Sequence, residues 1–341
     1  MTQTPSSSDH FRRGRFFNPG TQPQRFSHFM KWIIRRKIGY WPPYVDSAPG
    51  PRPAAKVEGE ELVATFVNHS TVLLQTRGIN FLTDPVWSKR VSPVSFLGPR
   101  RHRHPGIVFE DLPEIHCILI SHNHYDHLDL PTLKKLAARK QPAVFCPLGT
   151  GKLLRQAGLR HIHELDWWGH QPWEGLRIHC VPAQHFSART PFDRNKALWC
   201  GWVVEDATGN IYFAGDTGFG DHFSAIKERF EPMRLALLPI GAYKPEWFMG
   251  PIHMTPEEAV AAHEVLGAST AVAIHFGTFP LADDGLNEPS ERLDAALNRS
   301  IPSRPILVLQ EGEGRSIPAH TTAKSRGEKE LLPAAAKPLQ R

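Results

Sequence analysis

The chain carries a cluster of residue types that bind metal ions. Three histidines and one aspartate fall within six consecutive residues, where His122, His124, Asp126 and His127 form the pattern H-x-H-x-D-H. Imidazole nitrogens and carboxylate oxygens are together the ligands that borderline divalent metals prefer, zinc above all. A solvated, histidine-rich loop is the alternative, but that explanation suits single histidines better than a cluster with this spacing. The pattern therefore predicts a metal site.

The segments on either side of the cluster predict how it is held. Residues 115–120 are a short apolar run that is typical of a buried strand, and residues 131–139 have a helical pattern that opens with proline. The cluster should therefore occupy a loop between the carboxyl end of a strand and a helix, at the edge where open α/β sheets bind ligands. A loop can direct several side chains toward one point, whereas neighbouring residues of a strand face opposite ways.

Four other strand-like segments also end in metal-binding residue types, which are Asp84, His185, Asp216 and His275. A single histidine after a strand is usually structural, but together with the cluster these residues can complete two coordination spheres. Two metals about 3.5–4 Å apart lower the pKa of water held between them, so that hydrolysis needs no serine or cysteine nucleophile. The sequence contains neither a G-x-S-x-G motif nor a P-loop.

These motifs resemble the metallo-β-lactamase superfamily. More narrowly, the chain resembles the N-acylphosphatidylethanolamine-hydrolysing phospholipase D family and its bacterial relatives. The stretches that carry the resemblance are residues 81–85, 118–129, 164–168, 213–218, 239–243, 247–249 and 273–279. The histidine motif alone would indicate only the fold and the metals. The Trp247-Phe248-Met249 and Asp166-Trp167-Trp168 stretches narrow the match to this phospholipase D family.

The resemblance implies an α/β fold, an αββα sandwich of two mixed β-sheets flanked by helices, with a dinuclear zinc site at one rim. Iron and manganese are alternative metals. The first zinc would be held by His122, His124 and His185, the second by Asp126, His127 and His275, and Asp216 would bridge the two. The predicted catalytic residues are Asp84, which would orient a metal ligand, and Asp126, which would help to handle the proton of the attacking water.

Contacts to the substrate are predicted for four residues, Tyr125, Trp247, Phe248 and His253. The resemblance places His253 near a substrate phosphate, although the residues just before it depart from the animal enzyme. Trp247 and Phe248 follow a loop between two ligand-bearing segments, which favours a place in a cleft over core packing. Relatives often keep a histidine where this chain has His69, but they usually have glycine before it and this chain has Asn68, so His69 is left out of the predicted site.

The composition is that of a soluble globular protein. The chain has 341 residues, of which 40% are hydrophobic and 22% are charged. The net charge of +6 favours an anionic partner such as a phosphate ester, a lipid surface or a nucleic acid. We find no signal peptide and no apolar run of the roughly 18–20 residues that a membrane span needs. We therefore expect a cytoplasmic protein that associates with membranes peripherally.

Three regions are predicted from the composition along the chain. Residues 1–57 form a disordered or basic amphipathic N-terminal arm, residues 58–318 the hydrolase domain, and residues 319–341 a disordered tail. Within the arm, residues 25–37 form a helical pattern that places Phe26, Phe29, Met30, Ile33 and Ile34 on one face and basic residues on the other. Such a helix suits an anionic membrane surface. The alternative is a helix that docks on its own domain.

We expect hydrolysis of the phosphodiester of an N-acylphosphatidylethanolamine-type phospholipid, which would give phosphatidate and an N-acylethanolamine. One alternative is a soluble metal-dependent lactonase or phosphoesterase of the same fold. A nuclease is another, but we see no clear equivalent of the extra RNA-binding arm of such nucleases, so no nucleic-acid partner is expected. A non-catalytic membrane protein is the third, and the complete ligand set argues against it. A homodimer is what the resemblance suggests for the assembly.

Overall fold

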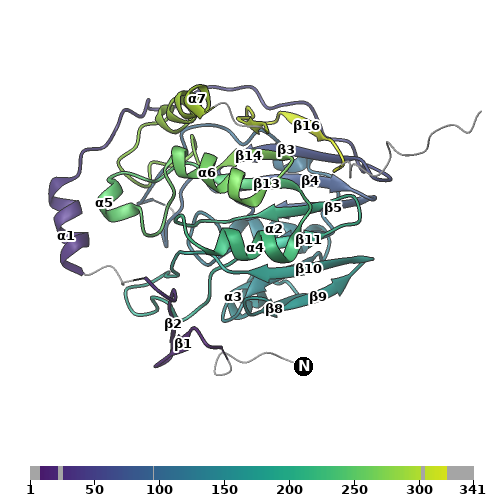
Figure 1. Ribbon diagram of the computed structural model, residues 1–341, viewed down its shortest axis with the longest axis horizontal. Helices are drawn as coiled ribbons and strands as arrows, with labels where there is room; N and C mark the ends of the chain where they lie inside the picture. Colours follow the sequence, from purple (N-terminus) through teal and green to yellow (C-terminus); the bar gives the residue numbers. More distant parts are fainter. Residues whose placement is uncertain (1–7, 22–25, 95, 301–303, 321–341) are drawn as a thin grey trace, which may run out of the picture.

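The computed structural model describes residues 8–21, 26–94, 96–300 and 304–320. Two seven-stranded sheets lie against each other and carry helices on their outer sides (Figure 1). The first sheet has the order β16-β3-β4-β5-β6-β7-β8, in which β5 to β8 are parallel and the others antiparallel. Its strands are β3 (Leu62–Asn68), β4 (Thr71–Thr76), β5 (Ile79–Thr83), β6 (Cys117–Leu119), β7 (Ala143–Pro147), β8 (Ile162–Leu165) and β16 (Gly314–Ile317).

The second sheet has the order β15-β14-β13-β12-β11-β10-β9 and is also mixed. Strands β12 to β15 are parallel, whereas β9 to β12 are antiparallel. Its strands are β9 (His170–Trp173), β10 (Leu176–Val181), β11 (Gly201–Glu205), β12 (Asn210–Phe213), β13 (Met233–Pro239), β14 (Thr270–Ile274) and β15 (Ile306–Leu307). The predicted sandwich of two mixed sheets is therefore confirmed.

Helices α2 (Leu130–Arg139) and α3 (Gly151–Gln156) cover the outer face of the first sheet, and α4 (His222–Phe230), α6 (Pro256–Leu266) and α7 (Glu288–Ser300) cover that of the second. Helices α1 (Phe26–Arg35) and α5 (Glu246–Met249) pack against each other beside the sheets, and a short 3-10 turn lies at Phe109–Asp111. Helix α6 begins with a capping box, since the backbone N–H of Glu258 donates to Thr255 and the Glu258 carboxylate accepts from the Thr255 backbone. None of the described helices is both long and apolar enough to cross a membrane.

Three apolar layers follow from the alternation of side chains along the strands. Phe81 and Leu119 point into the layer between the sheets, whereas Leu82 and Ile118 point outward, onto the layer beneath α2 and α3. In the second sheet Leu237 faces the middle layer, and its neighbours pack under α4, α6 and α7. Both faces of each sheet are thus buried, which explains why the strands appear in the sequence as nearly continuous apolar runs.

Strands of both sheets end at the same edge of the sandwich. In the first sheet β5 and β6 are parallel, and β3 has the same direction because β4 between β3 and β5 is antiparallel to both. In the second sheet β10 and β12 share one direction because β11 between them is antiparallel to both, and β12, β13 and β14 are parallel. The backbone N–H of His275, after β14, donates to the carbonyl of His69, after β3, at 2.8 Å. The edge therefore brings together the residues that follow strands of both sheets.

The N-terminal arm differs from its prediction of disorder. Residues 11–12 and 15–16 form a short antiparallel hairpin of strands β1 and β2, and Phe16 is only 1% exposed because it packs against Leu198 and Trp199. His10 is buried too, with its ring stacked on Trp167. This segment is rich in serine, glycine and arginine, a composition that predicts disorder, but a few aromatic residues anchor it to the domain. The predicted disorder of residues 1–7 and of residues 321–341 concerns parts of the chain outside the described residues.

Candidate metal centre

Three histidines form the first half of the site. The Nδ1 atom of His124 lies 2.8 Å from Nε2 of His122 and 3.3 Å from Nε2 of His185. His122 and His124 come from the loop after β6, and His185 follows β10 in the other sheet. Three ring nitrogens thus converge on one point from two sheets.

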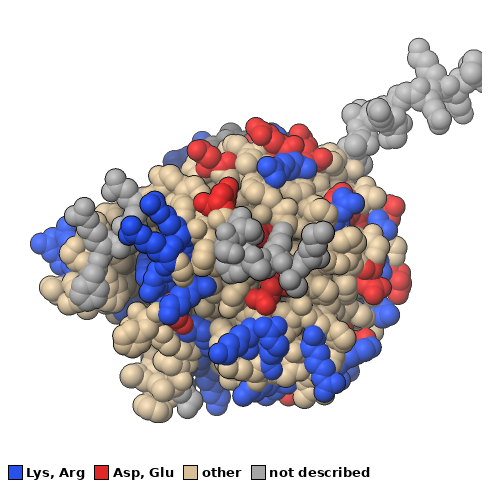
Figure 2. All heavy atoms as spheres, turned by 90° about the horizontal axis from the view of Figure 1, so that it is seen from below, with Lys and Arg blue, Asp and Glu red and all other residues tan. Residues whose placement is uncertain are grey.

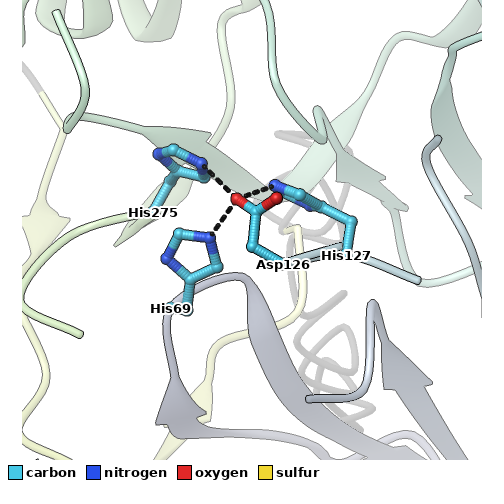
Figure 3. A group of neighbouring side chains, drawn as sticks. All are labelled: His69, Asp126, His127 and His275. Carbon is cyan, nitrogen blue, oxygen red and sulfur yellow. Dashed lines mark hydrogen bonds and ion pairs between the residues drawn. The ribbon is translucent and has the colours of Figure 1, made fainter. Parts of the chain in front are cut away.

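Four side chains form the second half, which Figure 3 shows. The Asp126 Oδ2 atom lies 3.0 Å from Nε2 of His69, 3.2 Å from Nε2 of His127 and 3.6 Å from Nε2 of His275. All three histidines turn one nitrogen toward the same carboxylate oxygen, and all four side chains are buried.

Asp216 lies between the two halves. Its Oδ2 atom is 3.1 Å from Nε2 of both His127 and His275, in the second half. The same oxygen is 3.9 Å from Nε2 of His122 and 3.7 Å from Nε2 of His185, in the first half. A single carboxylate oxygen therefore faces both groups of histidines, which is the position of a bridging ligand.

Asp84 orients the histidines from behind. Its Oδ2 atom accepts a hydrogen bond from Nδ1 of His127 at 2.6 Å, and its other oxygen accepts one from the backbone N–H of Ser121. The Ser121 hydroxyl donates to Asp84 and lies 2.9 Å from Nδ1 of His122. On the opposite side, Nδ1 of His185 donates to the carbonyl of Ile252 at 2.9 Å. These bonds use the Nδ1–H groups and leave the Nε2 atoms facing the site.

The backbone is strained where it enters the site. His69, Asp84 and His275 have φ values of 48°, 31° and 60°, in the left-handed region that side chains other than glycine rarely adopt. Gly215, just before Asp216, has a φ of 61°, and a Cβ atom there would lie 2.5 Å from the Cβ of Ser121. Strain of this kind persists where the surrounding structure holds it, and it often accompanies functional sites.

Burial and neighbouring charges set the protonation of the histidines. Burial lowers the pKa of His122 and His185 far below 6.5 and lowers that of His124 to about 4. Burial alone would also lower the pKa of His127 and His275, but Asp216 and Asp126 raise it, to about 9 for His275. Two histidines therefore carry protons that offset the charge of the buried carboxylates.

The two carboxylates of the site are ionised. Burial alone would raise the pKa of Asp126 and Asp216, but His127 and its neighbours lower both well below their usual range. The Oδ1 atom of Asp216 is buried and has no hydrogen-bond partner among the residues that the structure describes. Together with the converging lone pairs of the neutral histidines, this donor set fits divalent cations, which would replace the two protons as the compensating charge.

All seven predicted metal ligands are brought together at this one place. The structure adds His69, which the sequence analysis set aside and which approaches Asp126 more closely than either His127 or His275 does. Its position in the sequence could have identified it, because His69 directly follows a strand, as the other ligands do. The metal-binding role of each residue stays a prediction.

The predicted substrate contacts lie in different surroundings. His253 is buried beside the site, with its ring centroid 5.0 Å from that of His185 and 5.3 Å from that of His275. Tyr125 lines a groove next to the metal loop. Phe248 instead packs against Trp32 of α1, and Trp247 is half exposed beneath the ammonium group of Lys31. The pair Trp247 and Phe248 thus supports a helix, and its predicted part in substrate binding stays a prediction.

Comparisons with known proteins agree with this architecture. A family model described as the beta-lactamase superfamily domain matches residues 79–276. A relative in Caenorhabditis elegans, N-acyl-phosphatidylethanolamine-hydrolyzing phospholipase D 1, is 40% identical over 68% of this chain and 68% of its own length. A yeast relative from Saccharomyces cerevisiae, the mitochondrial N-acyl-phosphatidylethanolamine-hydrolyzing phospholipase D, is 36% identical over 67% of this chain and 50% of its own length.

Solved structures share the fold. The isothiocyanate hydrolase from Delia radicum gut bacteria superposes with a TM-score of 0.60 over 76% of this chain and all of that chain, at 24% sequence identity. At this level of identity the similarity concerns the fold alone.

Proposed function

The chain belongs to the metallo-β-lactamase superfamily and is related to the phospholipases D that hydrolyse N-acylphosphatidylethanolamine, and from this membership we propose that it is a dinuclear zinc phosphodiesterase acting on such membrane lipids. The single observation that carries the proposal is the position of Asp216, whose Oδ2 atom lies within 4 Å of nitrogens from both groups of histidines. One oxygen shared in this way suits two cations and not one.

The eight residues around the site would hold the metals. His122, His124 and His185 would bind the first, and Asp126, His127 and His275 the second, with His69 beside the second and Asp216 between the two. A pair of divalent cations at such a site makes water nucleophilic near neutral pH and offsets negative charge on a phosphoryl group. Zinc suits the imidazole-rich donor set, and iron and manganese are the other metals that accept it.

The side chains of this protein supply the remaining steps. Asp126 and His69 form a hydrogen-bonded pair at 3.0 Å, which can take up the proton that the attacking water releases. Burial lowers the pKa of His253 to about 3, so that its ring is neutral and can donate one N–H to a phosphoryl oxygen. Asp84 keeps His127 and, through Ser121, His122 in one orientation. The bond between phosphorus and the head-group oxygen breaks, and that oxygen takes the proton released by the water, which gives phosphatidate and an N-acylethanolamine.

The lipid substrate is inferred from the relatives. The names of the worm and yeast relatives state that those proteins hydrolyse N-acylphosphatidylethanolamine. Helix α1, which forms most of the predicted segment 25–37, also favours contact with a membrane for this chain. Helix α1 docks on the domain through Trp32, which is 8% exposed, while Ile34 is 77% exposed and Phe29, Met30 and Ile33 are about half as exposed.

Docking therefore leaves the apolar face of α1 directed outward. Trp32 stacks on Phe248 with ring centroids 5.2 Å apart, and Arg36 and the Trp32 indole both contact Asp283. On the face of the molecule that Figure 2 shows, Lys and Arg gather left of the centre and along the lower edge, and some also lie at the left end, where Figure 1 places α1. An outward apolar helix with basic neighbours is the arrangement that lies in the surface of an anionic membrane.

A substrate panel tests the proposal. The purified, metal-loaded protein is offered N-acylphosphatidylethanolamine, plain phosphatidylethanolamine, bis-p-nitrophenyl phosphate, a lactone and RNA. We expect turnover of the phosphodiesters, with the N-acylated lipid preferred, and release of phosphatidate. Preference for the lactone would instead indicate a soluble hydrolase of the same fold, and preference for RNA a nuclease. Either preference would overturn the proposed substrate.

A further inference from the structure

We propose that a basic groove beside the metal loop binds the phosphate head groups of anionic membrane phospholipids and holds the protein on the bilayer. The groove has a volume of about 580 Å³. Three loops and α2 form it, and its walls include Ser88, Lys89, Arg90, Tyr125, Lys134 and Arg189. This inference deepens the proposed function, on which it rests, by naming the surface that meets the lipid.

The cations of the groove are available to a ligand. Lys89 and Lys134 are exposed, and neither forms an ion pair within the described part of the chain. The groove also contains one carboxylate, that of Asp129, but its oxygens accept hydrogen bonds from the Ser88 hydroxyl at 2.8 Å and the Thr132 hydroxyl at 2.6 Å. The acid is thus engaged by its own loop, and the two ammonium groups dominate the open side of the groove.

The groove is fixed to the metal loop. Tyr125 stands between the predicted ligands His124 and Asp126, and the guanidinium of Arg189 lies 3.8 Å from the centre of its ring. The same guanidinium donates to the carbonyls of Asn123 and Leu128, both at 2.9 Å. A head group held in the groove therefore lies next to the predicted catalytic site.

Exposed apolar side chains follow the groove residues along two loops. Phe96 and Leu97, shortly after Lys89 and Arg90, are 79% and 66% exposed, and Phe192, shortly after Arg189, is 79% exposed. Each loop thus combines a cation at the groove with an apolar residue further along. A soluble anion would need only the cations, whereas a bilayer accommodates both features, with phosphates at the cations and acyl chains at the apolar side chains.

One side chain links the packing beneath the groove with the packing beneath α1. Leu281 packs both on the cluster that contains Val91 and Tyr125 and on the cluster that contains Trp32. Tyr125 of the groove and Trp32 of α1 therefore pack on two buried clusters that meet at Leu281. A single membrane contact could include both the groove and α1.

Vesicle binding without substrate tests the inference. The full-length protein is mixed with vesicles of phosphatidylcholine, or of phosphatidylcholine with phosphatidylglycerol, and the bound fraction is measured by flotation. We expect binding to the vesicles with phosphatidylglycerol. The double variant Lys89→Gln/Lys134→Gln should bind them about ten- to thirty-fold more weakly, since each basic residue near the surface of an anionic membrane contributes roughly one factor of ten or less. The variant Phe96→Ser/Leu97→Ser should also bind more weakly.

A matched control uses two exposed lysines that do not line the groove. The variant Lys56→Gln/Lys152→Gln changes the net charge by the same amount and should bind like the unmodified protein. Equal binding by the two double lysine variants, equal binding to both kinds of vesicle, or full displacement from vesicles by inorganic phosphate would overturn the inference. Hydrolysis of bis-p-nitrophenyl phosphate should be the same in the control variant Lys56→Gln/Lys152→Gln as in the unmodified protein. If the unmodified protein did not hydrolyse bis-p-nitrophenyl phosphate at all, the proposed function would be contradicted, whereas the flotation result would still test membrane binding by the groove.

Discussion

Asp84 accepts a 2.6 Å hydrogen bond from Nδ1 of His127 and thereby directs Nε2 of that histidine toward Asp126 and Asp216. The carboxylate also reaches His122 through the Ser121 hydroxyl. One buried acid thus orients a histidine in each half of the site. Because ligand histidines depend on such partners for their tautomer and ring orientation, Asp84 should affect both metals.

The variant Asp84→Asn tests this role. An amide has one acceptor oxygen and one NH2 group. In one orientation the NH2 group faces the backbone N–H of Ser121, and in the other it faces Nδ1 of His127 and the Ser121 hydroxyl, so either orientation disturbs the bonds that hold the histidines. We expect the affinity for zinc to fall about 10- to 100-fold, as measured by competition with a chromophoric chelator. Asp294→Asn, which changes an exposed carboxylate on α7, is the control and should leave the affinity unchanged. An unchanged affinity in Asp84→Asn would show that the orientation of His127 does not depend on this bond.

His69 provides a second prediction. Because its Nε2 atom lies 3.0 Å from Asp126, the variant His69→Gln should weaken the second metal selectively, by about tenfold or more. A titration of metal-free protein should then show one site of unchanged affinity and one weakened site. His161→Gln, at an exposed histidine, serves as the control. Equal weakening of both sites would mean that His69 supports the fold of the whole edge and not the second site.

The sequence predicted this site well because each ligand follows a strand. The pattern of apolar runs that end in histidine or aspartate located Asp84, the metal loop, His185, Asp216 and His275 without any knowledge of the distances between them. His69 was missed because the comparison with relatives favoured glycine before it. Asn68 is accommodated because its side-chain amide donates to the carbonyl of Val86. Contacts of this kind depend on the tertiary fold and leave no local sequence pattern.

The exposed face of α1 leads to a third prediction. The variant Ile33→Ser/Ile34→Ser removes apolar surface that is already open to water, so the free energy of unfolding should change little. Hydrolysis of lipid in vesicles should fall about tenfold or more, because each buried isoleucine contributes roughly 1.5–3 kcal/mol to binding an apolar phase. Turnover of bis-p-nitrophenyl phosphate should stay the same.

Val108→Ser is the matched control for this experiment, since Val108 is an exposed apolar residue away from α1 and the groove. It should leave both activities unchanged. A parallel loss of both activities in Ile33→Ser/Ile34→Ser would indicate that α1 supports the catalytic domain and not membrane contact.

The packing of His10 gives a pH-dependent prediction. Its ring nitrogens lie 2.8 Å from Asp9 and 3.0 Å from Asp166. Burial alone would lower the pKa of His10, but the hydrogen bonds to Asp166 and Asp9 raise it above 6.5. A raised pKa in the folded protein means that the stabilisation is complete below about pH 6.5, the value for an unfolded chain, and is lost as the pH rises through the raised pKa.

The pKa of Asp166 determines the lower end of the pH range in which this contact stabilises the fold. Burial alone would raise its pKa, but hydrogen bonds from His10 and Ser8 lower it below 3.8, so its contribution is present above about pH 4 and lost as the pH falls further. We expect His10→Gln to lower the free energy of unfolding by about 1 kcal/mol near pH 5–6, with a smaller loss near pH 9. Denaturant titrations of both proteins across this range measure the difference. A loss that is the same at every pH would show that the packing on Trp167, and not the charge, accounts for it.

The sequence predicted the type of fold, but it did not predict every strand. The strand-like run of residues 115–120 and the helical pattern of residues 131–139 agree to within a few residues with β6 and α2. Strands β8, β9 and β16 were missed because they alternate or expose polar residues such as His163, Gln171 and Arg315, so that only their pairing with neighbours makes them strands. The hairpin of residues 11–16 was missed for a related reason, because two buried aromatic contacts hold a segment whose composition is otherwise that of a disordered arm.

The central claim is that the side chains around Asp216 hold two divalent cations. Elemental analysis of the full-length protein, purified without chelator, measures the metal content per chain directly, and the same analysis of Asp216→Asn shows whether this carboxylate is shared. We predict about two zinc, iron or manganese ions per chain in the unmodified protein, and a lower content in the variant. A content of one ion or none in the unmodified protein, even after incubation with excess zinc, would contradict the account.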